Sequence, residues 1–131
     1  MEVKTLEGIE TKQLLEVFNA AFSDYFVPFQ LTEALLIAKM KADKVDLSIS
    51  VGAFDNNTLV AFVLHGFDVV DRKMQVYNAG TGVVPEKRGN GLTQKLYRFV
   101  LPLLRHKGID SIVLEVIDRS EEHTSELQSH R

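Results

Sequence analysis

The sequence predicts an α+β domain with a mixed central sheet, and two patterns along its 131 residues predict it. Residues 47 to 84 alternate apolar and polar side chains with a period of two and are interrupted by two short polar turns, which is typical of an antiparallel meander. Residues 74 to 117 then follow the order strand, loop, helix and strand, which predicts a parallel crossover. Helical patterns precede the meander, so helices are expected to flank the sheet.

The first third of the chain predicts one strand and two helices. A short strand at residues 3 to 6 precedes a helix that Thr11 can cap, and apolar side chains recur in that helix at helical spacing. An aromatic-rich loop is expected at residues 25 to 30, because Pro28 disfavours helical geometry in the residue before it. Thr32 then caps a second helix.

The meander consists of three predicted strands, at residues 47 to 53, 58 to 69 and 74 to 84. The segments 55 to 57 and 71 to 73 are polar and short enough to form the two hairpin turns. A helix follows Gly91 and ends in a run of cations and a glycine, which are favoured at helix C-termini. The last predicted strand spans Ser111 to Ile117.

Composition excludes several classes of function. The chain has a formal net charge of -3 and a pI near 5.8, which argues against a nucleic-acid or anionic-membrane surface. It contains no cysteine, so it offers no disulfide, no thiolate metal site and no cysteine nucleophile. Charged residues near the N-terminus and the lack of a long apolar run make a cytoplasmic location the expectation.

The segment from Val83 to Thr93 carries the clearest chemical signal. Gly89 and Gly91 lie where a strand ends and a helix begins, so free backbone N–H groups are expected at the positive end of a helix dipole. Such a loop can hold a pyrophosphate by its main chain, with Lys87 or Arg88 adding charge. Neither a Walker loop nor a dinucleotide-binding glycine motif is present. Glycines that only form the turn are the alternative.

Residues 74 to 117 resemble the cofactor-binding half of the GNAT N-acetyltransferases, whose signature is a strand ending in V-x-P followed by R-x-x-G-x-G or R-x-x-G-x-A. Val83-Val84-Pro85 matches the first part, and the run from Arg88 to Thr93 matches the second. Thr93 departs from the pattern, because it replaces the final glycine or alanine. The cofactor-binding residues that the resemblance implies are Val83, Val84, Lys87, Arg88, Gly89, Asn90, Gly91, Leu92 and Thr93.

The resemblance implies acetyl-CoA as co-substrate, no metal, and direct transfer of the acetyl group to a primary amine of a small molecule or peptide. The backbone of Val83 and Val84 would then pair with the pantetheine amides, and a backbone N–H of the same strand would stabilise the developing oxyanion. A non-catalytic acyl-CoA-binding module and a purely structural domain are the alternatives. A homodimer is left open.

The acceptor and catalytic residues are less well defined. The resemblance places the acceptor pocket near three aromatic residues of the first interhelical loop, whose alternative role is core packing: Tyr25, Phe26 and Phe29. Four side chains on predicted strands could face the cleft: His65, Asp68, Asn78 and Glu115. Strand residues of these types more often face solvent or satisfy a hydrogen bond, so none is assigned as the catalytic base.

Residues 119 to 131 differ abruptly in composition from the preceding strand and contain a single aliphatic residue. The segment from Arg119 to Ser129 resembles the in-frame translation of a short-read sequencing adapter. We therefore expect a partial GNAT domain at residues 1 to 118, incomplete at its C-terminus, and a non-native or disordered tail at residues 119 to 131. Poor acetyl-CoA turnover is the expected consequence, and the encoding nucleotides test the origin of the tail.

Overall fold

The computed structural model describes residues 1–24, 30–109 and 111–113, and these form one five-stranded sheet with helices on both faces. The sheet order is β1-β2-β3-β4-β5. The elements along the chain are β1 (Glu2–Thr5), α1 (Thr11–Ala21), α2 (Glu33–Ala42), the 3-10 turn η1 (Leu47–Ile49), β2 (Val51–Asp55), β3 (Thr58–Val70), β4 (Lys73–Val83), the 3-10 turn η2 (Pro85–Lys87), α3 (Leu92–His106) and β5 (Ser111–Val113).

The predicted meander is confirmed. Strands β2, β3 and β4 pair antiparallel in chain order, and β1 pairs antiparallel with the outer edge of β2. Asn56 and Asn57 form the first hairpin turn with φ of 51° and 68°, and Asp71 and Arg72 form the second with φ of 52° and 67°. Two successive positive φ values are the geometry that matches the twist of a two-residue hairpin.

The predicted crossover is also confirmed, because β5 pairs parallel with β4 after the chain has passed through α3. Within the described residues this pairing is confined to Gln75–Tyr77 of β4 and Ser111–Val113 of β5. The remainder of the last predicted strand, up to Ile117, lies outside the described residues. The fold class is therefore the mixed α+β sheet that the sequence predicts.

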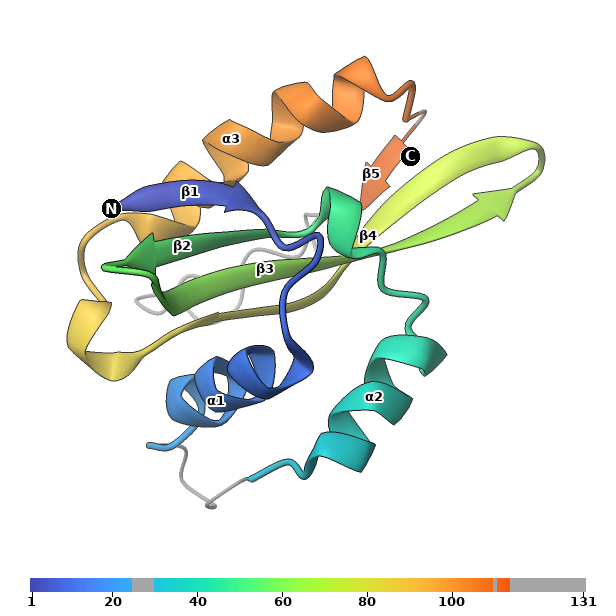
Figure 1. Ribbon diagram of the computed structural model, residues 1–131. Coiled ribbons are helices and arrows are strands. Elements are labelled where there is room, and N and C mark those ends of the chain that lie inside the picture. The colour runs from blue at the N-terminus through green and yellow to red at the C-terminus, as the bar shows by residue number, and fades with distance from the viewer. Residues whose placement is uncertain (25–29, 110, 114–131) are drawn as a thin grey trace.

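Helices cover both faces of the sheet, with α1 and α2 on one side and α3 on the other (Figure 1). Phe18 of α1 stacks on Phe62 of β3 with ring centroids 5.4 Å apart. On the opposite face, α3 buries four residues at helical spacing: Leu92, Leu96, Val100 and Leu104. The sheet is thus enclosed between two apolar layers, which fixes β4 and the start of α3 relative to each other.

Two local predictions need correction. Residues 47 to 49 form η1 rather than the start of a strand, because Asp46 accepts hydrogen bonds from the backbone N–H and the hydroxyl of Ser48, at 2.9 and 2.7 Å. This side-chain turn competes with the extended conformation that the alternating pattern predicts. Thr11 is the first residue of α1 and does not cap it, since Glu10 occupies the cap position without a side-chain bond. Thr32 caps α2 as predicted and accepts a hydrogen bond from the Leu35 N–H.

Candidate functional site

The last residues of β4 present one main-chain edge that β3 does not use. The Val84 N–H donates to the Val60 carbonyl at 3.0 Å, so the main-chain groups of Val84 point towards β3. Successive residues of a strand direct their main-chain N–H and C=O groups to opposite sides, so those of Val83 point away from β3. Its carbonyl accepts a hydrogen bond from Arg88 Nε at 3.1 Å, which agrees with this orientation. Within the described residues, β5 does not extend along this edge beyond Tyr77.

The loop after β4 leaves open space around its glycines. Gly89 and Gly91 have φ of 81° and 68°, which L-residues with a Cβ rarely adopt. A Cβ placed on either residue would have no atom within 4 Å. Gly91 is the N-cap of α3 and supplies no side-chain cap, so the first N–H groups of the helix are available to a ligand. The loop therefore has the open, donor-rich form of an anion site.

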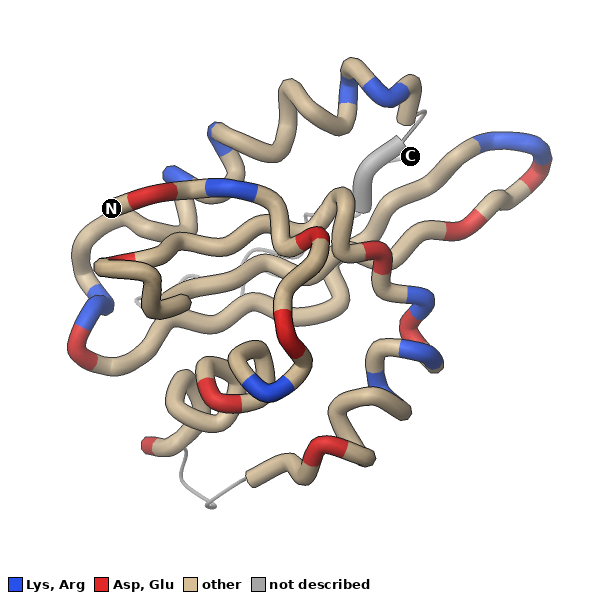
Figure 2. The backbone as a smooth tube through the Cα atoms, viewed as in Figure 1, with Lys and Arg blue, Asp and Glu red and all other residues tan. Residues whose placement is uncertain are grey.

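Charge along α3 supports the same conclusion. Between Leu92 and His106 the helix contains Lys and Arg residues and no Asp or Glu (Figure 2). Lys95 and Arg98 lie in its first two turns and are exposed. The helix that begins at the loop thus adds side-chain cations to the positive end of its own dipole, although the whole chain is acidic.

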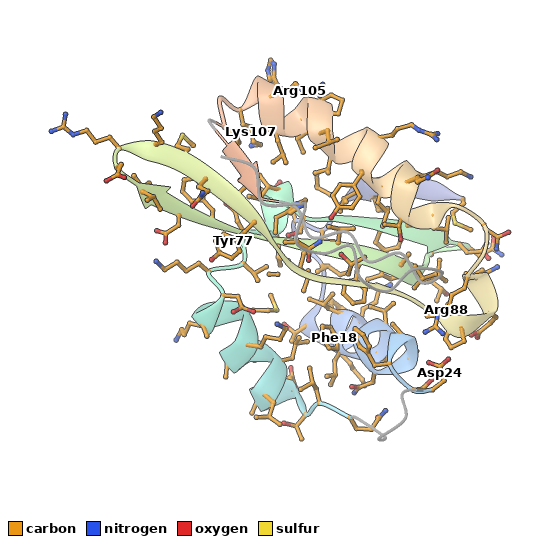
Figure 3. All side chains as sticks on the ribbon, turned by 180° about the vertical axis from the view of Figure 1, so that it is seen from behind. Phe18, Asp24, Tyr77, Arg88, Arg105 and Lys107 are labelled. Carbon is orange, nitrogen blue, oxygen red and sulfur yellow. The ribbon has the colours of Figure 1, made fainter. Side chains whose placement is uncertain are left out.

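Lys87 and Arg88, the two cations expected to add charge at the loop, both have carboxylate partners in the structure. Lys87 Nζ lies 2.8 Å from Asp55 Oδ2, and this contact lowers the pKa of Asp55. The Arg88 guanidinium extends to Asp24 after the end of α1, and both residues lie at the same end of the molecule (Figure 3). Of the predicted loop residues, Asn90 holds the turn closed by donating from Nδ2 to the Lys87 carbonyl at 3.0 Å.

A polar cluster connects β4 to α3 beside this edge. A bulge interrupts the β3–β4 pairing, because Leu64 and His65 are adjacent while their partners Gly80 and Asn78 are not. Asn78 Oδ1 accepts the Gly80 N–H at 2.8 Å, and Asn78 Nδ2 lies 2.7 Å from both the Thr81 hydroxyl and the Tyr97 hydroxyl. Burial raises the pKa of Tyr97, so its hydroxyl is protonated at neutral pH.

The strand residues considered as catalytic bases differ in their surroundings. His65 is fully buried, its Nδ1 donates to the Ile49 carbonyl at 2.7 Å, and its Nε2 has no partner among the described residues. Asp68 lies in the β3–β4 hairpin and pairs with Lys44 at 3.3 Å. Glu115 lies outside the described residues. The Nε2 atom of His65 is buried among the described residues, so no base is assigned.

The remaining predicted residues fall into three groups. Leu92 is buried and anchors the start of α3 in the core, whereas Thr93 is half-buried beside the loop. The predicted acceptor residues lie outside the described residues: Tyr25, Phe26 and Phe29. Sequence reasoning missed the roles of Asp24 and Tyr97. For Tyr97 the sequence offered one indirect signal, Gly80, because a glycine inside a strand often marks a bulge such as the one that contains Asn78.

Two further observations concern the described residues. They contain no group of three or more His, Asp and Glu side chains arranged to hold a metal ion. None of their helices combines the length and the apolar character that crossing a membrane requires.

Comparison with known proteins agrees with this geometry. Residues 12–124 match the family model described as "Acetyltransferase (GNAT) family". No curated protein sequence matches the chain.

Several solved structures share the fold. A GNAT family acetyltransferase from Brucella melitensis, in complex with acetyl-CoA, superposes with a TM-score of 0.71 at 20% identity, over 90% of this chain and 77% of that one. The ribosomal-protein-S18-alanine N-acetyltransferase from Escherichia coli gives 0.65 at 16% identity, over 96% and 71% of the chains. The NatC complex bound to Gag peptide and CoA gives 0.65 at 17%, over 92% and 78%.

Proposed function

Because the chain belongs to the acetyltransferase (GNAT) family, we propose that it transfers an acetyl group from acetyl-CoA directly to a primary amine. The observation that carries this proposal is the loop between β4 and α3. Its two positive-φ glycines have open space where a Cβ would lie, and the helix that follows has no side-chain cap. A diphosphate fits this arrangement, because main-chain N–H groups can surround it without obstruction.

The proposed cofactor position uses the loop and the end of β4. The main-chain N–H groups of residues 89 to 93 hold the diphosphate, and the outward N–H of Val83 pairs with the pantetheine arm. The pantetheine contact expected for the Val84 backbone is not part of this proposal, because the Val84 N–H donates to the Val60 carbonyl. All of these residues lie within 1 to 118, the domain that the sequence predicts. Bound acetyl-CoA supplies a thioester, which is the activated acyl group of the reaction.

Direct transfer needs no covalent intermediate on the protein. The acceptor nitrogen would form a bond to the acetyl carbon while the carbon–sulfur bond breaks and its electron pair leaves with the CoA sulfur. The proton lost by the nitrogen would pass to that sulfur, directly or through solvent. Holding an amine against a thioester can supply about 7–11 kcal/mol of the barrier through proximity alone. The absence of cysteine from the chain agrees with this route, because no thiol nucleophile is available.

The amine class of the acceptor is supported by the structural neighbours. One is crystallised with a peptide, and another is an N-acetyltransferase for an alanine of a ribosomal protein. We therefore propose a peptide or small-molecule amine as the acceptor, and Tyr25, Phe26 and Phe29 as residues that contact it.

The cofactor site is tested by paired glycine substitutions. Gly91→Ala places a methyl group where the diphosphate approaches, and we expect it to lower acetyl-CoA affinity at least tenfold in calorimetric titration. Gly108→Ala is the matched control. Gly108 also has a positive φ, of 78°, and open space at its Cβ position, but it lies beyond the other end of α3. Equal loss of affinity in both variants, or in neither, would remove the loop from the proposal.

Turnover separates the proposed enzyme from a non-catalytic acyl-CoA-binding module. Release of free CoA thiol is measured with a panel of small amines and peptides, beside titrations with acetyl-CoA and with CoA. Amine-dependent thiol release supports the enzyme. Binding of both ligands without release indicates the binding module, for which the departure at Thr93 is the supporting feature. Absence of binding would leave only a structural role for this fold.

A further inference from the structure

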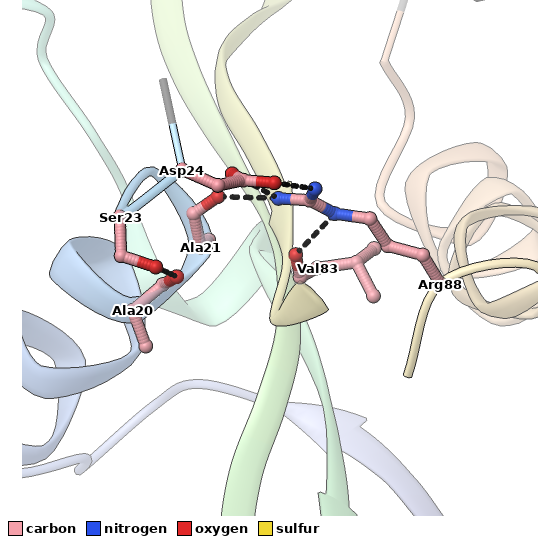
Figure 4. A network of polar contacts seen from close by, with 6 residues as sticks. All are labelled: Ala20, Ala21, Ser23, Asp24, Val83 and Arg88. Carbon is pink, nitrogen blue, oxygen red and sulfur yellow. Dashed lines mark hydrogen bonds and ion pairs between the residues drawn. The ribbon is translucent and has the colours of Figure 1, made fainter. Parts of the chain in front are cut away.

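The Arg88 side chain is bonded to three partners, which come from the end of β4 and from the C-terminal end of α1. Its Nε donates to the Val83 carbonyl at 3.1 Å, and its Nη2 donates to the Ala21 carbonyl at 2.6 Å. Its Nη1 and Nη2 also form a forked pair with the Asp24 carboxylate, at 2.7 and 3.2 Å. Figure 4 shows this arrangement, in which one guanidinium spans from the end of β4 to the end of α1.

These contacts use the donors of the guanidinium efficiently. The Ala21 carbonyl belongs to the last turn of α1, where carbonyls lack partners within the helix, and a cation there also complements the helix dipole. The planar fork matches the two oxygens of Asp24, a geometry that lysine cannot reproduce. The Val83 carbonyl points to the open edge of β4. Arg88 therefore donates to three acceptors, of which one belongs to β4 and two lie at or just after the end of α1.

Close packing brings these partners together. A Cβ added to Gly82 would lie 2.9 Å from the Ala21 Cβ and 2.8 Å from the Phe62 ring. The absence of a side chain at Gly82 thus allows the end of α1 to approach β4 directly. The short gap between helix and strand is the gap that the guanidinium spans.

We infer that Arg88 is a positioning residue whose side chain fastens the C-terminal end of α1 to the cofactor loop, and that it is not a phosphate ligand. This inference rests on the proposed acetyl-CoA site. Because the same residue lies in the loop through its main chain and contacts α1 through its side chain, order gained by the loop on binding is transmitted to the end of α1. The cofactor loop and the C-terminal end of α1 are therefore thermodynamically linked, and each affects the stability of the other by the same free energy.

Hydrogen exchange measures this link without requiring turnover. The Phe22 and Ser23 amides donate to the Phe18 and Ala20 carbonyls at the end of α1, at 3.3 and 3.2 Å. We expect acetyl-CoA to slow their exchange about fivefold or more in the wild-type chain. The Asp43 amide, bonded to the Lys39 carbonyl at the end of α2, is the internal control and should not respond. In Arg88→Lys and Asp24→Asn the effect at α1 should disappear, and its persistence in both variants would overturn the inference.

Acetyl-CoA affinity separates the positioning role from phosphate binding. If Arg88 bound phosphate, Asp24→Asn would release the guanidinium and tighten binding, Arg88→Met would weaken it, and Arg88→Lys would restore part of the affinity. The positioning role predicts that Asp24→Asn and Arg88→Met weaken affinity by the same factor, about threefold or less, and that the double variant equals either single one. Changes of acetyl-CoA affinity in opposite directions for the two single variants would refute the positioning role.

The contact between Arg88 and the end of α1 can also be tested if the chain does not bind acetyl-CoA. When the wild-type chain binds no acetyl-CoA, the proposed function is wrong, but the Arg88–Asp24 contact can still be measured by thermal unfolding. Non-additive shifts of the unfolding midpoint in the double variant support the fastening of α1, and additive shifts reject it.

Discussion

His65 shows how one buried side chain couples the fold to pH. Its Nδ1 donates to the Ile49 carbonyl, so the neutral ring carries its hydrogen there and directs the Nε2 lone pair into the protein. The ring lies edge-on to Tyr97, with centroids 6.1 Å apart. Burial lowers the pKa of His65, and the bond to Ile49 only partly opposes this effect. The folded protein therefore resists protonation at this site.

The direction of the pH dependence follows from that shift. Between the ordinary histidine pKa of about 6.5 and the lowered folded value, the unfolded chain binds a proton that the folded chain does not. The stabilisation is complete above pH ~6.5 and is lost as pH falls, by up to about 1.4 kcal/mol per pH unit. Urea unfolding across this pH range measures the slope of the unfolding free energy against pH. His65→Gln should flatten it relative to wild type, whereas His106→Gln, at an exposed position, should not. Identical slopes in all three proteins would contradict this account.

At the scale of elements, the Asn78 cluster joins the β4 bulge to α3. The Asn78 side chain bonds the Gly80 N–H in the bulge and the Tyr97 hydroxyl on the helix. Tyr97→Phe removes one hydrogen bond and should cost about 0.5–1.5 kcal/mol of unfolding free energy. Asn78→Leu leaves the half-buried Gly80 N–H and the Thr81 and Tyr97 hydroxyls without this partner and should cost about 1–3 kcal/mol. Chemical denaturation measures both values.

The coupling between these two substitutions tests the cluster. The combined Asn78→Leu and Tyr97→Phe variant should lose less stability than the sum of the single losses, because both remove the same bond. Tyr77→Phe is a control, since the Tyr77 hydroxyl bonds the Asp43 carbonyl after α2 instead. Additive losses for Asn78 and Tyr97 would show that the two elements are not joined through this contact.

The order and pairing of the elements were predictable from the sequence, whereas contacts between distant side chains were not. Hydrophobic periodicity and turn residues identified the meander and the crossover, because these signals are local. Leu47–Ile49 was mispredicted because its alternating pattern fits a strand, while the Asp46 side chain stabilises a turn. The Arg88–Asp24 pair joins residues 64 positions apart, and no local signal specifies such a partner. The motif therefore predicts a candidate site but does not reveal that its two cations, Lys87 and Arg88, are paired with carboxylates.

At the scale of the whole molecule, positive charge is concentrated on α3. The helix and the residue after it carry Lys95, Arg98, Arg105 and Lys107 and no acid, so a chain of net charge -3 has +4 there and -7 elsewhere. Arg105 and Lys107 lie far from Arg88 in the molecule (Figure 3). The proposed polyanionic cofactor would consequently be attracted by one helix of a protein whose net charge is negative.

Distance along α3 decides which of these cations acts on the cofactor. At 1.5 Å per residue, Lys95 and Arg98 lie about 6 and 10 Å from Gly91 along the helix axis, and Arg105 lies about 21 Å away. The screening length is about 10 Å at 0.1 M salt. Replacing Lys95 and Arg98 with Gln should therefore weaken acetyl-CoA binding about three- to tenfold at low salt. The matched replacement of Arg105 and Lys107 removes equal charge and should have less than half of that effect in free energy.

Titrations in 0.05 and 0.5 M salt should show the difference between the two double variants shrinking as screening increases, because an attraction exerted through solvent is weakened by ions. A difference that is independent of salt would contradict this electrostatic account.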